Sequence, residues 1–457
     1  MLDPETCLKD FLDDLFAEYK AKRIEYCLLR NYESLPERLD SADIDILISS
    51  SARKKNREII KNISVNHNAL ICSLYVDERF DQITLFRRIS SKHIFSVKLD
   101  FYSLQLYGVR LLSESDGLAS RIAYRNFYVA SDTWQVLDKW LFGYLLNAPL
   151  PEKYHEKFQE VFSNNYHAMA ISLSGIFGEK RALQICETVC KAGFSCLPKV
   201  GKLELLCILS RVVLKNPYFH IRNIPRFLYY QLKNRIILPG EFISVSGPDG
   251  CGKTTVLGLA MAQLELTFCC PAKKLHHFRP NILPRIASVL KMAGLVSSVD
   301  EEYSSPHRGS VSGFWGSLFR FLYYWIDYTC GYFLRIRPAL VRRELVVFDR
   351  YYFDMIADPG RSRIALPLWM LKFGLKIIPL PKTSFFIHVS PEIVLQRKQE
   401  LSLGKIQELN ANYLKVVATT KLKCLDNNSV AEIAAASLVD KVIERRIKRF
   451  NLGRLLR

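Results

Sequence analysis

The sequence GPDGCGKTT, residues 247–255, follows the apolar run FISVS and constrains the fold of this chain more than any other feature. Its spacing fits G-x-x-x-x-G-K-[ST], in which a buried strand leads through a glycine-rich turn into a helix. The turn wraps a phosphate with its backbone N–H groups, and the positive end of the helix faces the same anion. The alternative, a glycine-rich turn without a ligand, is disfavoured because the preceding strand and the following helical run TTVLGLAMAQLEL both fit.

The loop residues predicted to hold the nucleotide are Gly247, Asp249, Gly250, Cys251, Gly252, Lys253, Thr254 and Thr255. The glycines permit backbone conformations and a close approach that side chains would prevent. We expect Lys253 to neutralise the outer phosphates and the hydroxyl of Thr254 to ligate magnesium. The loop predicts a bound nucleotide, but it does not separate a kinase from a switch or a motor.

Two further segments place charge where a transferred phosphate needs it. ELVVFDRYYFD ends an apolar strand with Asp349, which can organise magnesium and its waters, and Arg350, whose planar guanidinium can grip an acceptor phosphate. SPEIVLQRKQEL follows the strand TSFFIHV and puts Arg397 and Lys398 in a helix that would close over the moving phosphoryl group. The alternatives are a strand end with a surface salt bridge and a solvated helix face. The predicted catalytic residues are Lys253, Asp349, Arg350 and Arg397.

At 457 residues the chain is too long for one ordinary core. Residues 1–132 are predicted to be α/β, because runs rich in β-branched and aromatic residues accompany helical stretches. Residues 133–236 show spacings of three and four without obvious strands, which predicts a helical segment ended by prolines that include Pro225. Residues 237–457 restart with a strand and have the size of one domain. The predicted fold class is α/β: a C-terminal parallel sheet flanked by helices carries the phosphate loop, after a helical segment and an N-terminal α/β domain.

The C-terminal part resembles the thymidylate kinase-like branch of the nucleoside monophosphate kinases. The resemblance rests on FISVSGPDGCGKTT, on RFLYYWIDYTCGYFLRIRPALVRRELVVFDRYY and on FIHVSPEIVLQRKQEL, spread over residues 242–401. It implies ATP and Mg²⁺ as cofactors and transfer of the γ-phosphoryl group to a bound acceptor. It also implies that Asp249 faces the acceptor, that Arg350 binds the acceptor's phosphate and that Arg397 belongs to a lid. A looser correspondence places Arg279 on the acceptor's phosphate.

The departures from this family concern the acceptor. WIDYTCG puts Tyr328 after Asp327 where the family usually carries an arginine that reads thymine, and YFDMIADPGRSR replaces the serine and the Ala-Tyr-Gln run after DRY. The replacement adds Asp354, Asp358, Arg361 and Arg363. Because groups that hydrogen-bond a base confer discrimination, their loss undermines thymidylate as the acceptor. The variant resembles a subset linked with bacterial surface-polysaccharide synthesis, so the expected acceptor is a nucleoside monophosphate, a phosphosugar precursor or another phosphorylated metabolite.

Three carboxylates form a second candidate site near the N-terminus. DSADIDILIS places Asp43 and Asp45 two apart on one predicted strand, hence on one face, and Asp100 ends the later strand VKLDFY. This set resembles the metal ligands of the nucleotidyltransferase fold, where two magnesium ions straddle a hydroxyl and a nucleotide phosphate. The Gly-Ser turn expected before the first pair is absent, and LLRNYESLP stands there. We expect a divergent domain that keeps the fold and part of the metal site, with catalysis left to the phosphate loop; a domain that only binds substrate or a partner is the alternative.

The net charge of +19 predicts anionic partners. No helix-turn-helix or RNA-binding signature accompanies the charge, so ATP and a phosphorylated small molecule are expected rather than nucleic acid. Two basic segments, SRVVLKNPYFHIRNIPRFLYYQLKNR and the tail KVIERRIKRFNLGRLLR, can lie on an anionic membrane or form helices with one packed and one solvated face. The oligomeric state stays open, with a dimer as one option.

Three observations predict a cytoplasmic protein. The twelve cysteines are scattered without a CxxC pair, as expected for thiols in a reduced compartment. The acidic start MLDPETCLKDFLDDLF lacks a signal pattern, and Asp3 before Pro4 predicts the capped start of a helix. Arg320, Asp327 and Lys372 interrupt the apolar stretches that come nearest to a transmembrane helix.

The predicted function is an ATP- and magnesium-dependent phosphotransferase. Two alternatives from other classes stay open. One is an ATP-binding scaffold or regulatory protein without kinase activity, which would have little need for Arg350. The other is a bifunctional protein with nucleotidyl transfer in its N-terminal domain.

Overall fold

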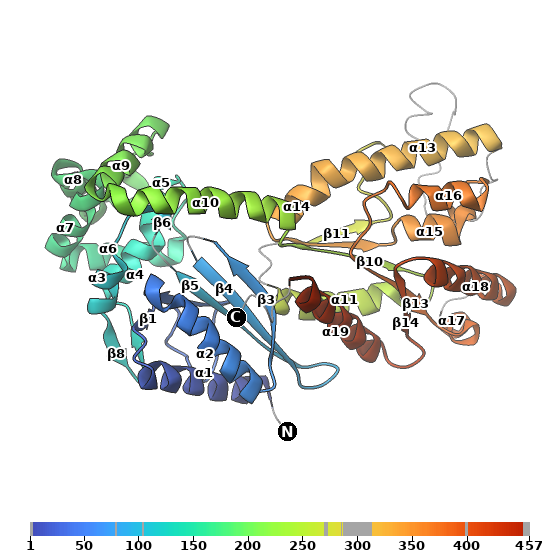
Figure 1. The fold of residues 1–457 in the computed structure, drawn as a ribbon, viewed down its shortest axis with the longest axis horizontal. Helices are drawn as coiled ribbons and strands as arrows, with labels where there is room; N and C mark the ends of the chain where they lie inside the picture. The colour runs from blue at the N-terminus through green and yellow to red at the C-terminus, as the bar shows by residue number, and fades with distance from the viewer. Residues whose placement is uncertain are drawn as a thin grey trace. The chain divides into compact units, whose positions relative to one another are not determined.

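The computed structural model describes residues 3–77, 80–102, 105–268, 273–284, 286, 313–397 and 401–450. The chain forms two compact units, shown in Figure 1. The first consists mainly of Met1–Ile89 and His93–Lys233, and the second mainly of Asn234–Arg449. The first unit contains both the predicted α/β segment and the predicted helical segment; that each of them is a domain of its own stays a prediction.

A seven-stranded mixed sheet, ordered β3-β4-β5-β2-β1-β9-β8, organises the first unit. The strands of this sheet are β1 Tyr26–Leu28, β2 Ile44–Ile48, β3 Leu70–Val76, β4 Phe80–Arg88, β5 Ile94–Tyr102, β8 Ile122–Tyr124 and β9 Phe127–Val129. The pairs β2–β5 and β1–β9 are parallel, and the other pairs are antiparallel. Two short strands, β6 Gln105–Leu106 and β7 Val109–Arg110, form a separate ribbon. The strands after residue 104 are too short for alternation to reveal them in the sequence.

Hydrophobic cores lie on both faces of this sheet because successive side chains of a strand point to opposite faces. Ile46 of β2 belongs to the core shared with α1 Pro4–Ala21 and α2 Arg53–Asn66. Leu47, the next residue, belongs to the core shared with the later helices. The predicted start of α1 is confirmed, since Oδ1 of Asp3 accepts hydrogen bonds from the backbone N–H groups of Glu5 and Thr6.

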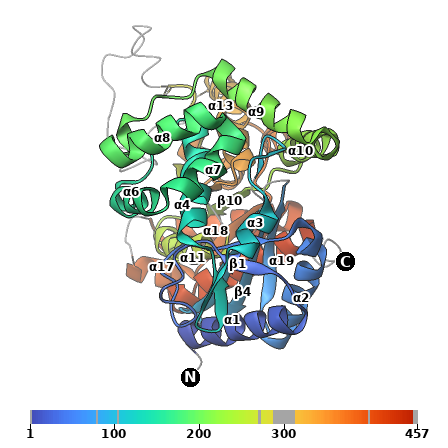
Figure 2. The same cartoon turned by 90° about the vertical axis from the view of Figure 1, so that its left-hand side faces the viewer.

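Residues 133–236 contain helices and no strand. The remaining helices that begin in the first unit are α3 Glu114–Ala119, α4 Asp132–Val136, α5 Phe142–Leu145, α6 His155–Asn164, α7 Tyr166–Phe177, α8 Glu179–Ala192, α9 Lys202–Lys215 and α10 Pro217–Ile237. Helices α6, α7 and α8 pack against one another (Figure 2). Pro225 lies inside α10 instead of ending the helical segment. A proline lacks one amide donor, so α10 continues through Pro225 without one of its backbone hydrogen bonds.

The second unit is built on a five-stranded, fully parallel sheet with the order β11-β12-β10-β13-β14. Its strands are β10 Glu241–Ser246, β11 Lys273–His277, β12 Leu345–Asp349, β13 Thr383–His388 and β14 Leu422–Asp426. The central strands are buried along their length, as expected when helices cover both faces of a parallel sheet. The fold is thus mixed α/β, with parallel pairing flanked by helices.

The described residues of the second unit form the helices α11 Lys253–Thr267, α13 Phe314–Gly331, α14 Arg337–Val341, α15 Tyr352–Ala357, α16 Leu368–Gly374, α17 Pro391–Arg397, α18 Leu403–Thr419 and α19 Ala431–Phe450. Large aromatic side chains fill its core, and Tyr328, Tyr351, Tyr352 and Tyr413 are almost completely buried. Across the described helices, no stretch combines the length and the apolar composition that crossing a bilayer requires.

Candidate functional site

The loop 247–252 joins β10 to α11 at the carboxyl end of the central strand. The chain leaves β10 for β11 on one side of the sheet, and later leaves β12 for β13 on the other side. Ligands of parallel α/β sheets bind beyond the carboxyl ends of the strands, where the connections diverge in this way. The loop therefore lies where the topology alone favours a binding site.

Two glycines of the loop have backbones and surroundings that a side chain would disturb. Gly247 has φ 151° and Gly252 has φ 86°. A Cβ atom at Gly247 would lie 2.9 Å from Sγ of Cys251, and one at Gly252 would lie 2.7 Å from Nδ2 of Asn427. Gly252 directly precedes α11 and offers no side-chain cap, so the first N–H groups of that helix depend on another acceptor.

Lys253, the first residue of α11, turns its side chain back onto the loop. Its Nζ donates hydrogen bonds to the carbonyl oxygens of Gly247, at 2.9 Å, and of Pro248, at 2.6 Å. The side chain is buried, and this desolvation lowers the pKa of the ammonium group. A buried cation held by two neutral carbonyls gains from an anion that reaches the loop.

Asp349 ends β12, next to the strand that carries the loop. In the parallel register it lies opposite Val245 of β10 and His277 of β11. Its Oδ2 lies 3.4 Å from Nδ1 of His277, and its Oδ1 is buried without a hydrogen-bond partner among the described residues. Burial acts to raise the pKa of Asp349, but the hydrogen bond with His277 and the positive charges of Lys253 and Arg350 lower it overall. Asp349 thus stays an anion with one oxygen available to a ligand.

Arg350 is 2% exposed, and protein groups surround its guanidinium. Nη1 donates to the carbonyl oxygen of Gly247 at 2.9 Å and to Oδ1 of Asp354 at 3.1 Å, while Nη2 donates to Asp249. Its backbone has φ 72°, a conformation that costs energy for a residue with a side chain. The side chain is therefore fixed from several directions before any acceptor binds.

Asp249 and Asp354 hold the arginines of this site in place. Asp249 accepts hydrogen bonds from Arg350 and from Arg361, and their charges keep its pKa well below the usual range although burial opposes this. Asp354 is 1% exposed and accepts from Ser246 Oγ at 2.5 Å and from Tyr413 Oη at 2.6 Å. The guanidinium groups of Arg350 and Arg361 thus meet at one carboxylate of the loop itself.

Arg397 ends α17 and lies against the loop from another direction. A Cβ atom at Gly252 would lie 3.6 Å from its Nη1, and its Nη2 donates to the carbonyl oxygen of Asn427 at 3.3 Å. The side chain is exposed, as are those of Thr254 and Thr255. Lys398, the second cation predicted for this helix, lies outside the described residues.

Arg279, to which the family resemblance assigns an acceptor phosphate, forms an ion pair within the protein. Its Nη1 lies 3.3 Å from Oδ2 of Asp327, which is completely buried. The same carboxylate accepts hydrogen bonds from the backbone N–H groups of Asn281, Ile282 and Leu283. Asp327 therefore organises the segment after β11, and Arg279 neutralises it.

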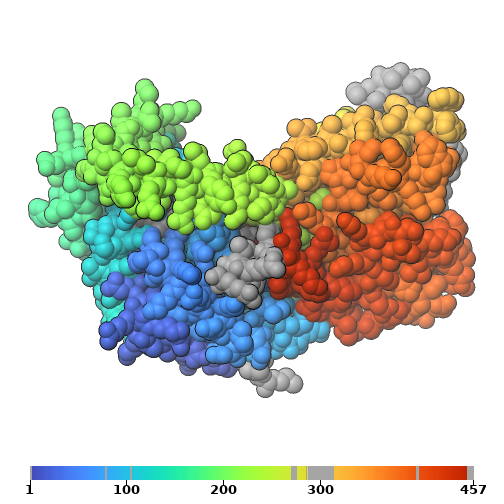
Figure 3. All heavy atoms as spheres, viewed as in Figure 1, coloured from blue at the N-terminus to red at the C-terminus, as the bar shows by residue number. Residues whose placement is uncertain are grey.

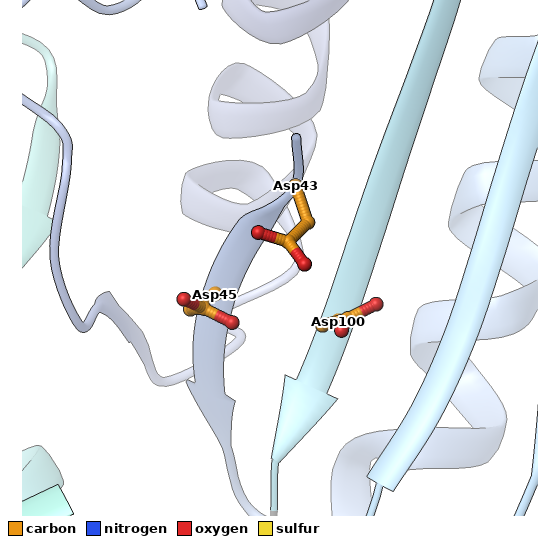
Figure 4. A group of neighbouring side chains, drawn as sticks. All are labelled: Asp43, Asp45 and Asp100. Atoms are coloured by element: carbon orange, nitrogen blue, oxygen red, sulfur yellow. The ribbon is translucent and has the colours of Figure 1, made fainter. Parts of the chain in front are cut away.

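The three N-terminal aspartates come together (Figure 4). Asp43 directly precedes β2, Asp45 belongs to β2 and Asp100 belongs to β5. The parallel register pairs Asp45 with Asp100, so both side chains project from the same face of the sheet. One carboxylate oxygen from each of the three lies within 4.8 Å of the others. Such a set of oxygens suits a hard divalent cation.

This carboxylate cluster already contains a cation of the chain. Arg30 donates to Asp138, and its Nη2 lies 2.9 Å from Oδ2 of Asp45. Burial acts to lower the pKa of Arg30, but the two aspartates raise it overall, so the guanidinium keeps its charge. Desolvation raises the pKa of Asp45 to about 6. Arg30 belongs to LLRNYESLP, the segment that stands where a Gly-Ser turn was expected.

Sequence analysis missed several residues of both sites. Asn427 follows β14, donates from Nδ2 to the carbonyl oxygen of Cys251 at 2.9 Å and is 1% exposed. His277 at Asp349, Tyr413 at Asp354, and Arg30 with Asp138 at Asp45 were also unassigned. The available signal was a polar residue one or two positions after a strand, which applies to Asn427 and to Arg30 but does not identify their partners.

No model of a known protein family matches the chain, and no curated protein matches it. Among solved structures, the chain is similar to thymidylate kinase from Ehrlichia chaffeensis, with 15% sequence identity and a TM-score of 0.31. The match covers 44% of this chain and 98% of that protein. A likeness of this size establishes neither a shared fold nor a shared activity.

Proposed function

We propose that this protein is an ATP- and magnesium-dependent phosphotransferase whose phosphate-binding loop is the segment 247–252. It moves the γ-phosphoryl group of ATP to a nucleoside monophosphate or a related phosphorylated acceptor, a surface-polysaccharide precursor being one such compound. Two features support this reaction class. The loop 247–252 suits the phosphates of the donor, and Arg350 and Arg361 suit a second anion, the phosphate of the acceptor.

The observation that carries this proposal is the unpartnered oxygen of Asp349 beside the loop. Oδ1 of Asp349 is buried without a hydrogen bond from the described residues, on the strand that pairs with β10. An unpaired carboxylate oxygen of this kind is costly unless a cation occupies its vicinity. Carboxylate and hydroxyl oxygens are the ligands that Mg²⁺ prefers, so Asp349 and Thr254 would hold it. When bound, magnesium neutralises charge on the phosphates.

The remaining groups of the chain bind and orient the donor. Lys253 exchanges the carbonyl oxygens of Gly247 and Pro248 for phosphate oxygens, which gives its buried charge an anionic partner. The first N–H groups of α11 and of the loop surround the same phosphates. Arg397 is exposed and lies next to Gly252, so its guanidinium can reach the γ-phosphoryl group that is transferred. Catalysis then consists chiefly of positioning and electrostatic stabilisation.

The acceptor's phosphate meets the arginines that share Asp249. Arg361 keeps part of its side chain exposed, whereas Arg350 is 2% exposed and fixed by Asp354. We infer that Arg361 contacts the acceptor's phosphate first and that Arg350 completes the contact. Because Asp249 already orients both guanidinium groups, little side-chain freedom is lost when the acceptor binds.

A panel of nucleoside monophosphates and phosphosugars, screened with ATP for ADP release, tests the proposal. At least one acceptor should stimulate ADP release in a magnesium-dependent manner, and Lys253→Ala should abolish it while the chain stays folded by circular dichroism. Undiminished turnover in the folded variant would contradict the proposal.

A nucleotide-binding scaffold is distinguished from a kinase by Arg350. In the kinase, Arg350→Ala weakens acceptor binding and leaves ATP affinity nearly unchanged. If the whole panel fails while ATP still binds tightly, the scaffold is favoured.

We also propose that Asp43, Asp45 and Asp100 bind one divalent cation in the first unit. The convergence of their oxygens within 4.8 Å supports this, and the ion pair between Arg30 and Asp45 argues against a second ion. The bifunctional alternative, with nucleotidyl transfer here, needs two ions. Mn²⁺ binding to the full chain should lose one site in Asp45→Asn and a different site in Asp349→Asn. An unchanged number of sites in Asp45→Asn would contradict this second proposal.

A further inference from the structure

Helix α10 packs one face against the first unit through the ribbon of β6 and β7. Nδ2 of Asn223 donates to the carbonyl oxygen of Gly108 at 2.8 Å, and Nε2 of His220 accepts a hydrogen bond from the backbone N–H of Arg110 at 3.2 Å. A Cβ atom at Gly108 would lie 3.0 Å from Cα of Ile224 and 3.1 Å from Cβ of Phe227. These contacts fix which side of α10 faces the protein.

The opposite face of α10 exposes a continuous apolar stripe. The stripe residues within the first unit are Tyr218, Ile221, Leu228, Tyr229 and Leu232, each at least 59% exposed. Their spacings of three, seven, one and three place them along one side of the helix, and the exposed Pro225 continues the same side. Figure 3 shows the light green surface of α10 on the face in view. A helix of a globular protein normally buries such a stripe.

Cations border this stripe, and α10 itself carries no acidic residue. Arg222, Arg226 and Lys233 follow the stripe along one flank, and Pro217–Ile237 contains no Asp or Glu. The guanidinium of Arg226 and the ammonium of Lys233 each lie 5.6 Å from the ring centre of Tyr230. The charge and the apolar surface thus occupy one side of one helix.

The second basic segment of the chain does not share this arrangement. In α19, the apolar residues Val442 and Ile443 are at most 1% exposed and belong to the interior of the second unit. Arg446 of the same helix lies 3.1 Å from Glu241. Both stretches are rich in basic residues, but among their described residues only α10 also exposes an apolar face.

We propose that the α10 stripe docks on an anionic lipid membrane surface. The leucines and Ile221 enter the boundary between headgroups and acyl chains, and the tyrosine rings lie at headgroup level. Arg222, Arg226 and Lys233 bind lipid phosphates, and each adds to the attraction near a negatively charged surface. A second copy of this chain is disfavoured as the occupant, because pairing two such stripes brings cationic flanks together.

Co-sedimentation of the full chain with lipid vesicles tests this. We expect binding to vesicles of phosphatidylcholine mixed with phosphatidylglycerol, weakening as salt rises, and little binding to phosphatidylcholine alone. Leu228→Ser with Leu232→Ser, and Arg222→Gln with Arg226→Gln, should each lower binding roughly tenfold or more.

The matched controls change exposed residues outside the stripe. Ile171→Ser with Leu183→Ser removes exposed apolar side chains of α7 and α8, and Lys180→Gln with Lys199→Gln removes exposed cations. Both control variants should bind like the unmodified chain. No binding to anionic vesicles, or equal losses in stripe and control variants, would overturn the proposal. The proposal would also be overturned if the unmodified chain sediments as a dimer and the Leu228→Ser, Leu232→Ser variant as a monomer. A second copy of the chain would then cover the stripe.

Discussion

In the second unit, Asp349 ends β12 with one oxygen unpartnered among the described residues, whereas in the first unit Asp45 of β2 already holds the guanidinium of Arg30. Both aspartates are partly or fully buried, and each lies opposite a residue of a neighbouring parallel strand. The two regions therefore use the same geometry with a different source of neutralising charge. A carboxylate that is already paired directly with a guanidinium needs less from a metal than a carboxylate with an unpartnered oxygen. This difference leads us to place catalysis in the second unit.

The largest expected effect comes from replacing the aspartate of each site in turn, Asp349→Asn in the second unit and Asp45→Asn in the first. We expect Asp349→Asn to lower acceptor-dependent ADP release roughly a thousandfold, because a ligand and charge at the reacting phosphates are lost. Asp45→Asn should leave that rate unchanged. Steady-state ADP release by both variants provides the measurement, and equal losses would mean that the two sites act together.

Removing Arg30 should leave Asp45 without its guanidinium partner, so that Asp45, like Asp349, would have an unpartnered carboxylate oxygen. Arg30→Gln leaves the buried carboxylates of Asp45 and Asp138 without their positively charged partner, which should lower the free energy of unfolding by about 3 kcal/mol. Mn²⁺ should restore part of this stability by replacing the lost positive charge. The control Arg38→Gln breaks an exposed pair with Asp40 and should change stability little. Denaturant unfolding with and without Mn²⁺ measures both effects, and a metal-independent loss would contradict the cation site.

Arg361→Gln tests the role of the two arginines that contact Asp249, Arg350 and Arg361, in the second unit. We expect the KM for the acceptor to rise about tenfold, with the KM for ATP nearly constant, because one charged contact to the acceptor's phosphate is lost. Arg363→Gln changes a neighbouring exposed arginine and serves as the matched control. A parallel rise in the KM for ATP would instead place Arg361 at the donor.

Asp249 gives the smallest expected effect, a pH dependence of stability. The pKa of folded Asp249 lies below its unfolded value of about 3.9, so below that pH the unfolded chain binds the extra proton. The contribution of Asp249 is therefore present above about pH 4 and is lost as the pH falls further. It should be on the order of 1 kcal/mol, visible as a shallower acid loss of stability in Asp249→Asn. Identical acid profiles for the two proteins would contradict the paired state of Asp249.

Much of the local structure could be predicted from the sequence. The capped start of α1, the strands of β2 to β5 and the strand, loop and helix around residues 241–267 follow from residue types and spacing within short segments. The short strands β6 to β9 and the passage of α10 through Pro225 could not be predicted in this way. Two or three residues carry too little periodicity, and a proline usually ends or kinks a helix, so the sequence predicts an end at Pro225.

The sequence by itself determined that this chain carries a phosphate-loop pattern and three aspartates in or directly before strands, because backbone preferences depend on neighbours along the chain. Only the tertiary structure decided which charges meet. Arg30 and Asp138 are 108 residues apart in the chain, and Arg361 and Asp249 are 112 apart. Tertiary packing also left the apolar stripe of α10 uncovered while it buried that of α19. The energy of a charge or an apolar face depends on what lies within a few ångströms in space, and the fold alone sets those distances.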